Sequence, residues 1–178
     1  RSTTALPAMA LPRASHRAVR LQDGRILITG GVTNGGLVTA TCEVFDPATN
    51  TFSLAGLMNA PRAGHAVTLL NDGRVLISGG VSDWQNAAAQ LAARLSTAQN
   101  TAEIFDPITG LFTPVPNMAA RRFGHSQTLL PNGSVLLISG ISGGTSAVDP
   151  TTGQTGQTPL WTPTCEVFDP ATLSYTPT

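Results

Sequence analysis

Short apolar runs separated by turn residues recur along the chain and predict β-strands. Residues 66–70 and 74–78 are two such runs, and they flank the Asp-Gly pair at 72–73. Asp-Gly readily adopts the positive φ angles of a tight hairpin turn. Glu-Val-Phe-Asp at 43–46 predicts a third strand, and Phe52 anchors a fourth strand after the next turn. The pattern therefore predicts units of four short strands.

The same unit occurs three times. It opens with an Arg-x-x-His segment, carries a pair of small residues after its second strand, and places aromatic residues in its third and fourth strands. The opening segments are Arg13–His16, Arg62–His65 and Arg122–His125. The small pairs are Gly30-Gly31, Gly79-Gly80 and Ser139-Gly140, and the aromatic pairs are Phe45 with Phe52, Phe105 with Phe112, and Phe168 with Tyr175. Because Ser139 replaces a glycine, we expect the chain to leave this strand differently in the third unit.

A four-stranded sheet cannot bury both of its faces alone, so the units must stack, and four-stranded units packed radially form a β-propeller. In its opening segments, small pairs and aromatic pairs the chain resembles the kelch-repeat family, including the propeller domain of galactose-oxidase-like proteins. The expected fold is all-β: a kelch-type β-propeller segment of three four-stranded antiparallel blades, with a short helix inserted in the second. The family includes protein scaffolds, carbohydrate-related proteins and some oxidases, so the fold alone does not assign a function.

The three expected blades, 1–57 (with the tail of a preceding outer strand), 58–117 and 118–178, differ in one connection. The second small residue and the glutamate of the third strand are separated by 12 positions in the first unit, 23 in the second and 26 in the third. All the additional length is therefore on one face, which in repeat proteins is commonly the binding face. The spacing of apolar residues predicts a helix over 83–95, and the Gly/Thr/Gln-rich segment 141–163 predicts an extended or partly disordered loop.

The chain begins and ends at the same point of the repeat unit. By the repeat spacing, the outer strand of a preceding blade falls near Thr3, and the chain ends three residues after Tyr175. Three blades alone expose two apolar sheet faces, which soluble proteins rarely do. We therefore expect either further blades on a longer polypeptide, the usual means of closure, or a ring of several copies, in which two copies give six blades.

Composition excludes several kinds of partner and chemistry. Ten Arg balance ten acidic residues, and charged residues make up only 11% of the 178 positions. A nucleic-acid or anionic-membrane surface would need a basic excess, and no apolar run approaches the ~20 residues that span a bilayer. The absence of Lys excludes Schiff-base and P-loop chemistry. The low charge and the absence of Lys favour an extracellular or periplasmic location.

Polar residues that recur in every unit are expected to serve the fold. The three histidines could form a metal site, but a hydrogen bond to a neighbouring blade explains a repeated residue better. A buried Arg–Glu contact explains the repeated arginines and glutamates in the same way. Cys42 and Cys165 are expected to lie well beyond the ~7 Å limit for a disulfide, so both should be free. Copper-radical chemistry needs tyrosines near a thiol and a His pair, and Tyr175 is the only tyrosine. We therefore expect no catalytic residue, metal or cofactor.

Residues outside the repeat pattern are better candidates for binding. Trp84 and Trp161 lie in the inserted connections, where Trp stacks on sugar rings, anchors a protein partner, or fixes its own insertion to the propeller. Arg17 and Arg20 break the pattern of the first strand, and Arg20 replaces a leucine of the other units. Contact with the channel, solvent or a partner explains these arginines, as does protection of the sheet against wrong pairing.

The sequence favours a non-enzymatic protein-interaction or scaffold module that uses the long-loop face of a kelch propeller. Its partner would be a protein or further propeller blades, of the same chain or of another copy. The first alternative is a carbohydrate-binding or carbohydrate-processing protein of galactose-oxidase-like type, of which this chain is a part. The second alternative is a structural subunit of a larger assembly.

Overall fold

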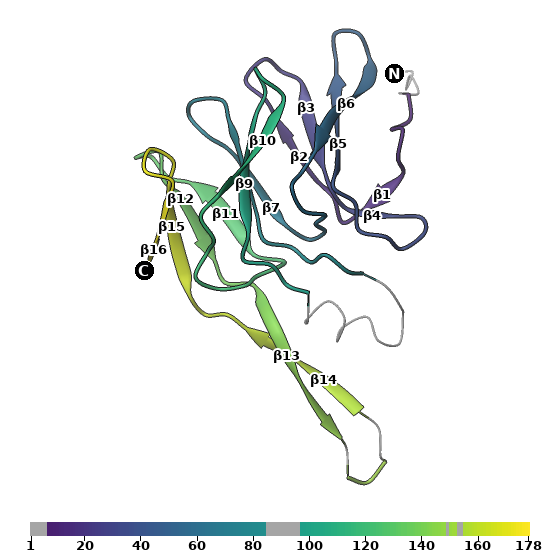
Figure 1. Ribbon diagram of the computed structural model, residues 1–178, viewed down its shortest axis with the longest axis vertical. Coiled ribbons are helices and arrows are strands. Elements are labelled where there is room, and N and C mark those ends of the chain that lie inside the picture. The colour runs from purple at the N-terminus through teal and green to yellow at the C-terminus, as the bar shows by residue number, and fades with distance from the viewer. Residues whose placement is uncertain (1–6, 85–96, 149, 153–154) are drawn as a thin grey trace, which may run out of the picture.

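The computed structural model describes residues 7–84, 97–148, 150–152 and 155–178. Within these residues all regular secondary structure is β-strand, and three four-stranded antiparallel sheets form the body of the protein (Figure 1). None of the described residues forms a helix long and apolar enough to cross a membrane.

Each sheet takes its four strands from one repeat unit. The first sheet contains β2 (Arg17–Arg20), β3 (Ile26–Thr29), β5 (Thr41–Asp46) and β6 (Thr51–Leu57). The second sheet contains β7 (Ala66–Leu69), β8 (Val75–Ser78), β9 (Ala102–Asp106) and β10 (Leu111–Val115). The third sheet contains β11 (Ser126–Leu129), β12 (Val135–Ile138), β15 (Cys165–Asp169) and β16 (Ser174–Pro177).

The predicted turns and aromatic pairs fix the register of each sheet. The N–H of Leu21 donates to the carbonyl of Arg25 across the first Asp-Gly turn, at 2.8 Å. On the outer pair of strands, Phe45 faces Phe52 with ring centroids 4.9 Å apart, and the matching rings of the other two sheets are 4.7 and 4.9 Å apart. Such tilted aromatic pairs stabilise cross-strand neighbours.

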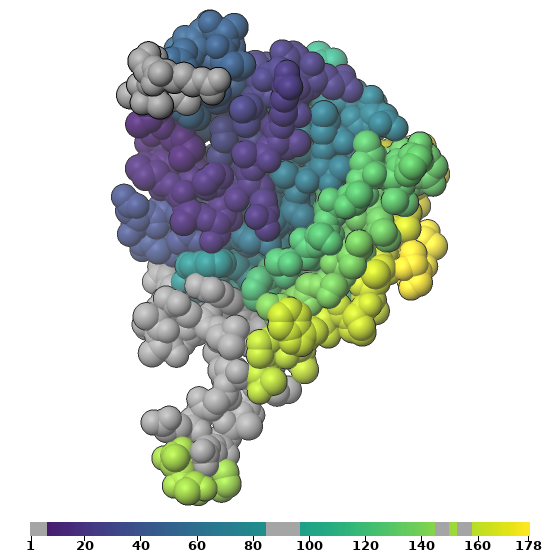
Figure 2. All heavy atoms as spheres, turned by 180° about the vertical axis from the view of Figure 1, so that it is seen from behind, coloured from purple at the N-terminus to yellow at the C-terminus, as the bar shows by residue number. Residues whose placement is uncertain are grey.

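The three sheets stand side by side, with β7 in contact with both β2 and β11. Figure 2 shows this order as a progression of colour from the first unit to the third. One apolar cluster fills the space between the first and second sheets, around Leu27, Val44 and Ile77, and another fills the space between the second and third, around Leu76, Val135 and Phe168. The hydrophobic core therefore lies between the sheets, as stacking of the units requires.

Two further pairs of strands lie outside the four-stranded sheets. The short strands β1 (Arg13–Ala14) and β4 (Val32–Thr33) pair with each other, and β13 (Ile141–Val148) pairs with β14 (Thr155–Trp161). The segment 141–163, expected to be an extended or partly disordered loop, therefore contains a regular antiparallel hairpin. Backbone hydrogen bonds hold this hairpin, and they need no alternation of apolar side chains.

The third unit leaves its second strand as the other two do, contrary to expectation. Ser139 has a φ of 57°, close to the 56° of Gly30 and the 63° of Gly79. The carbonyl of Ser139 also accepts a hydrogen bond from Arg122, as those of the two glycines do from their own arginines. The serine therefore adopts the left-handed backbone conformation that the connection requires.

The predicted helix over 83–95 lies outside the described residues, except for its first two positions. Asp83 and Trp84 are not helical. The N–H of Asp83 donates to the hydroxyl of Thr97 at 3.2 Å, so the two ends of this insertion lie close together where they leave the body.

Candidate functional site

The connections between the second and third strands of the three units lie at one end of the sheets, which we call the loop face. Beneath them lies an apolar cluster, the loop-face cluster, made of Val32, Ala63, Val81, Ala98 and Phe123. Antiparallel backbone bonds support this cluster within the units: Ala63 and Val81 exchange two bonds in the second unit, and Phe123 exchanges two in the third with Ile141, which packs against the cluster. The loop face therefore rests on a packed and hydrogen-bonded base.

The two tryptophans differ in their exposure on this face. Trp84 is half-buried and packs against the loop-face cluster. Trp161 lies at the end of β14, opposite Ile141 of β13, and 68% of its surface is exposed. Its neighbour Leu160 is 47% exposed. Trp84 therefore contributes to the packed base of the loop face, whereas most of the Trp161 side chain is exposed to solvent.

The hairpin that carries Trp161 extends beyond the sheets. β13 and β14 run away from the body (Figure 1), and the tip at residues 150–152 stands apart from it (Figure 2). Leu37, in the turn after β4, is 58% exposed on the connection of the first unit. The loop face therefore combines a projecting hairpin with exposed apolar side chains.

The structure places Arg17 and Arg20 at the two ends of β2. Arg17 donates its Nε–H to the carbonyl of His65 at 2.7 Å and so joins the first sheet to the second. Arg20 is exposed, and its guanidinium lies beside the turn at Gly24, at the end of the sheet opposite the loop face. The four residues predicted to bind therefore do not form one site.

The repeated arginines and glutamates form a buried ion pair in each unit, as expected. Arg13 bonds Glu43 at 2.7 Å, Arg62 bonds Glu103 at 2.7 Å, and Arg122 bonds Glu166 at 2.5 Å. Each arginine also donates to at least two carbonyls of its own unit, and each glutamate accepts at least one backbone N–H from the segment before the arginine. These bonds compensate for the loss of water around the buried charges, so the pairs serve the fold.

Two of the histidines bond the preceding sheet, as expected. Nε2 of His65 lies 2.8 Å from the hydroxyl of Thr29, and Nε2 of His125 lies 2.9 Å from that of Ser78. The Ser78 hydroxyl donates to Gln127 at 2.6 Å, so it accepts from His125. This bond assigns the proton of His125 to Nε2, and leaves a buried Nδ1 with no partner among the described residues.

Burial keeps both of these rings neutral. Desolvation, reinforced by Arg122, lowers the pKa of His125 to about 3. Desolvation and the Arg62 charge hold the pKa of His65 well below its usual range. Neutral rings that bond a neighbouring sheet act in packing, and no cluster of three or more potential metal ligands occurs among the residues that the structure describes.

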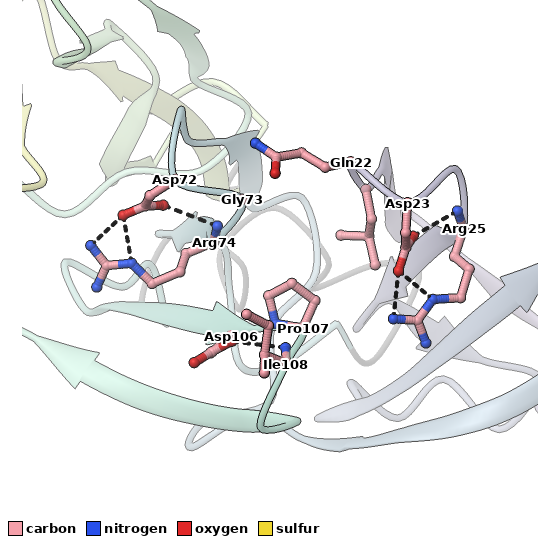
Figure 3. A pocket seen from close by; sticks show the side chains of 10 residues that line it. Gln22, Asp23, Arg25, Asp72, Gly73, Arg74, Asp106, Pro107 and Ile108 are labelled. Carbon is pink, nitrogen blue, oxygen red and sulfur yellow. Dashed lines mark hydrogen bonds and ion pairs between the residues drawn. The ribbon is translucent and has the colours of Figure 1, made fainter.

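A surface pocket of about 500 Å³ lies at the opposite end, between the turns of the first two sheets. The exposed pairs Asp23–Arg25 and Asp72–Arg74, each 2.7 Å apart, flank it, with Pro107 and Ile108 between them (Figure 3). A hydrogen bond from Arg25 lowers the pKa of Asp23. Sequence reasoning did not select this pocket, although Asp-Gly-Arg occurs in two of the three units. Each arginine is already paired with its own turn, so the pocket presents little free charge to a ligand.

Comparison with known proteins agrees with this architecture. Residues 13–58 match the family model described as Kelch motif. The chain is similar to the structure of YjhT, with a TM-score of 0.70 and 19% identity, over 98% of this chain and 54% of that chain. It is also similar to a novel fungal alcohol oxidase with catalytic diversity among the AA5 family, in complex with copper, with a TM-score of 0.52 and 17% identity, over 97% of this chain and 45% of that chain.

These similarities establish the fold. The chain spans about half the length of each of the two structures. No curated protein matches it.

The side chains described here do not fit the copper of the second structure. His65 and His125 are bonded to hydroxyls of the preceding sheet. Tyr175 packs against Phe168 between sheets, and burial raises the pKa of its phenol. Cys42 and Cys165 are in equivalent positions of different sheets. These groups do not converge on one point, so we derive no copper chemistry for them.

Proposed function

Because this chain is built of kelch repeats with the β-propeller fold, we propose that it is a non-enzymatic module that binds a protein partner on its loop face. The exposure of Trp161 carries the proposal. Large aromatic side chains dominate the energy of protein interfaces because they bury much apolar area at a small entropic cost. A Trp that is 68% exposed at the base of a projecting hairpin is suited to this role.

The surroundings of Trp161 support the same surface. Leu160 and Leu37 add exposed apolar area, and Trp84 and Ile141 are fixed against the loop-face cluster below. A rigid base limits the entropy lost when a partner binds. The repeated Arg, Glu and His residues bond within and between the sheets, which leaves the inserted connections as the variable part of the repeat.

Quantitative co-purification with matched variants tests the proposal. We expect a protein that is retained by the unchanged chain and by Ile108→Ala and is lost with Trp161→Ala. Ile108 is a suitable control because it is 92% exposed but lies among the turns at the end of the sheets opposite the loop face, which we call the turn face. Equal retention by both variants, or no retained protein, contradicts the proposal.

A carbohydrate ligand is the second candidate, and the same exposed indole favours it. The face of a Trp ring stacks on the apolar face of a sugar. A glycan array separates the two candidates, since stacking predicts binding of a defined glycan by the unchanged chain and its loss with Trp161→Ala. Absence of glycan binding leaves the protein partner as the ligand of this face.

A further inference from the structure

The third sheet has an open face that matches the buried faces of the other two sheets. In the first sheet Leu21, Leu27, Cys42 and Val44 are at most 5% exposed beneath the second sheet. In the second sheet Leu70, Leu76, Ala102 and Ile104 are likewise at most 4% exposed beneath the third. The matching residues of the third sheet are only half-buried: Leu130, Leu136, Cys165 and Val167. We call these four residues and Ile138 the open face. The open face is thus a continuation of two interfaces that exist in the structure.

Two features hold the opening segment of each following unit against the preceding sheet. The histidine bonds a hydroxyl, Thr29 or Ser78, at the end of the second strand. The arginine carbonyl accepts the N–H of the second small residue, from Gly31 to Arg62 and from Gly80 to Arg122, each at 2.9 Å.

The first glycine of each pair makes this approach possible. A Cβ on Gly30 would lie 2.3 Å from the carbonyl oxygen of Arg62, and a Cβ on Gly79 would lie 2.3 Å from that of Arg122. Cβ atoms do not approach a carbonyl oxygen so closely, so any other residue at these positions displaces the opening segment that follows.

The open face lacks both features. Ile138 occupies the position of the two hydroxyl residues, and it is 37% exposed whereas Thr29 and Ser78 are fully buried. Ser139 brings a Cβ to the position where the opening segment of a following unit would place its arginine carbonyl. A unit opened by Arg-x-x-His would therefore lose its histidine bond and be held away from this sheet.

We propose that the open face of the third sheet is a docking surface for a β-sheet whose opening segment carries an apolar side chain in place of the histidine. It binds units opened by Arg-x-x-His less tightly, among them the first sheet of a second copy of this chain. An apolar side chain can pack against Ile138 without needing a hydrogen-bond partner. An opening segment that makes no histidine bond can also lie further from the sheet, which avoids the Cβ of Ser139. In a ring closed by two copies through this interface, His16 of one copy would meet Ile138 of the other without a hydroxyl to bond. The Arg13 carbonyl would also meet the Cβ of Ser139.

The first sheet of a second copy of the chain can be used to probe the open face, because its opening segment contains His16. His16 occupies the position of His65 and His125, and the structure gives its side chain no hydrogen-bond partner among the described residues. Self-association of four proteins then forms a double-mutant cycle: the unchanged chain, Ile138→Ser/Ser139→Gly, His16→Leu, and the combination of all three substitutions.

Two of the four proteins have matched interfaces, namely Ile138→Ser/Ser139→Gly, which keeps His16, and His16→Leu, which keeps Ile138. We expect these two to self-associate more tightly than the unchanged chain and the combined variant, whose interfaces are mismatched. Ile138→Ser/Ser139→Gly restores the hydroxyl and the glycine that His16 and Arg13 require, so its dimer Kd should be about tenfold lower than that of the unchanged chain. His16→Leu, which places an apolar side chain against Ile138, should also lower the Kd. The combined variant should lose both gains. Sedimentation velocity over a concentration series measures each Kd.

Thiol labelling shows whether association uses the open face. Cys165 should become protected as the matched variants associate, and Cys42, between the first two sheets, should stay unlabelled in all four proteins as a check of folding. Equal Kd values in all four proteins, including no association in any, overturn the proposal. So does association that leaves Cys165 reactive, or an unchanged chain that associates most tightly.

Discussion

His125 bonds the hydroxyl of Ser78 across the boundary between the third and second sheets, with 2.9 Å between Nε2 and Oγ. His65 and Thr29 make the same contact between the second and first sheets. One repeated residue therefore supplies the same specific bond to both interfaces between sheets. The structural role of the histidines leads to the first prediction.

Thr29→Val removes the hydroxyl that bonds Nε2 of His65 while keeping the size of the side chain. The buried Nε2 then loses its hydrogen-bond partner, so the free energy of unfolding should fall by about 1–3 kcal/mol. Thr128→Val, at an exposed position on β11, is the matched control and should change it by less than about 0.5 kcal/mol. Urea denaturation measures both, and equal effects would show that the hydroxyl does not matter.

Acid should destabilise the protein through the same histidines. Between the usual pKa of 6.5 and the folded pKa of about 3 for His125, the unfolded chain binds a proton that the folded chain does not. Stability should therefore fall with decreasing pH below about 6.5, by up to about 1.4 kcal/mol per pH unit for each such histidine. In the His125→Gln variant the number of protons taken up on unfolding in this pH range should fall by about one, so the slope should be smaller. Denaturation midpoints measured from pH 4 to pH 7 test the difference, and identical slopes contradict it.

The buried ion pairs should be far more important to stability than the exposed ones. Glu103→Ala leaves the guanidinium of Arg62 buried without its carboxylate, which should cost about 3–5 kcal/mol. Asp72→Ala breaks an exposed pair with Arg74 and should cost less than about 1 kcal/mol. Thermal and chemical denaturation compare the two variants, and a similar small loss in both would contradict a structural role for the Arg–Glu series.

Gly79 and Ser139 hold the same backbone conformation but should respond in opposite ways to exchange. Gly79→Ser places a Cβ against the Arg122 carbonyl and should cost more than about 2 kcal/mol. Ser139→Gly relieves a left-handed serine and should be neutral or stabilising by about 1 kcal/mol. The difference in their unfolding free energies is the measurement, and equal values would contradict the clash.

Repetition explains why so much of the fold could be predicted from the sequence. The tight turns, the Arg–Glu pairs and the histidines depend on residue types that recur along the chain, namely Asp or Asn before Gly, an Arg with a Glu, and a His in each unit, so three copies support one interpretation. The hairpin of β13 and β14 could not be predicted, because it depends on backbone bonds in a segment without side-chain periodicity. Sequence also could not distinguish Trp84 from Trp161, since their exposure depends on a loop-face cluster assembled from residues distant along the chain.

The two free cysteines report on the difference between a covered and an open sheet face. Burial raises the pKa of the Cys42 thiol to about 12, so it should not react with a thiol reagent at neutral pH. Cys165, half-buried on the open face, should be labelled in the folded chain. Mass spectrometry of the labelled protein should therefore find one modification, at Cys165. Two modifications, or one at Cys42, would contradict the arrangement of the sheets.

Site-specific photo-cross-linking tests the proposed contact surface most directly. A photoreactive residue replaces Trp161 in one protein and Ile108, on the turn face, in another, and each is activated in an extract that contains the natural partner. A protein partner on the loop face predicts a discrete cross-linked product from position 161 and none from position 108. Cross-linking of the same protein from position 108 alone, or from neither position, would contradict the assignment of the loop face as the binding surface.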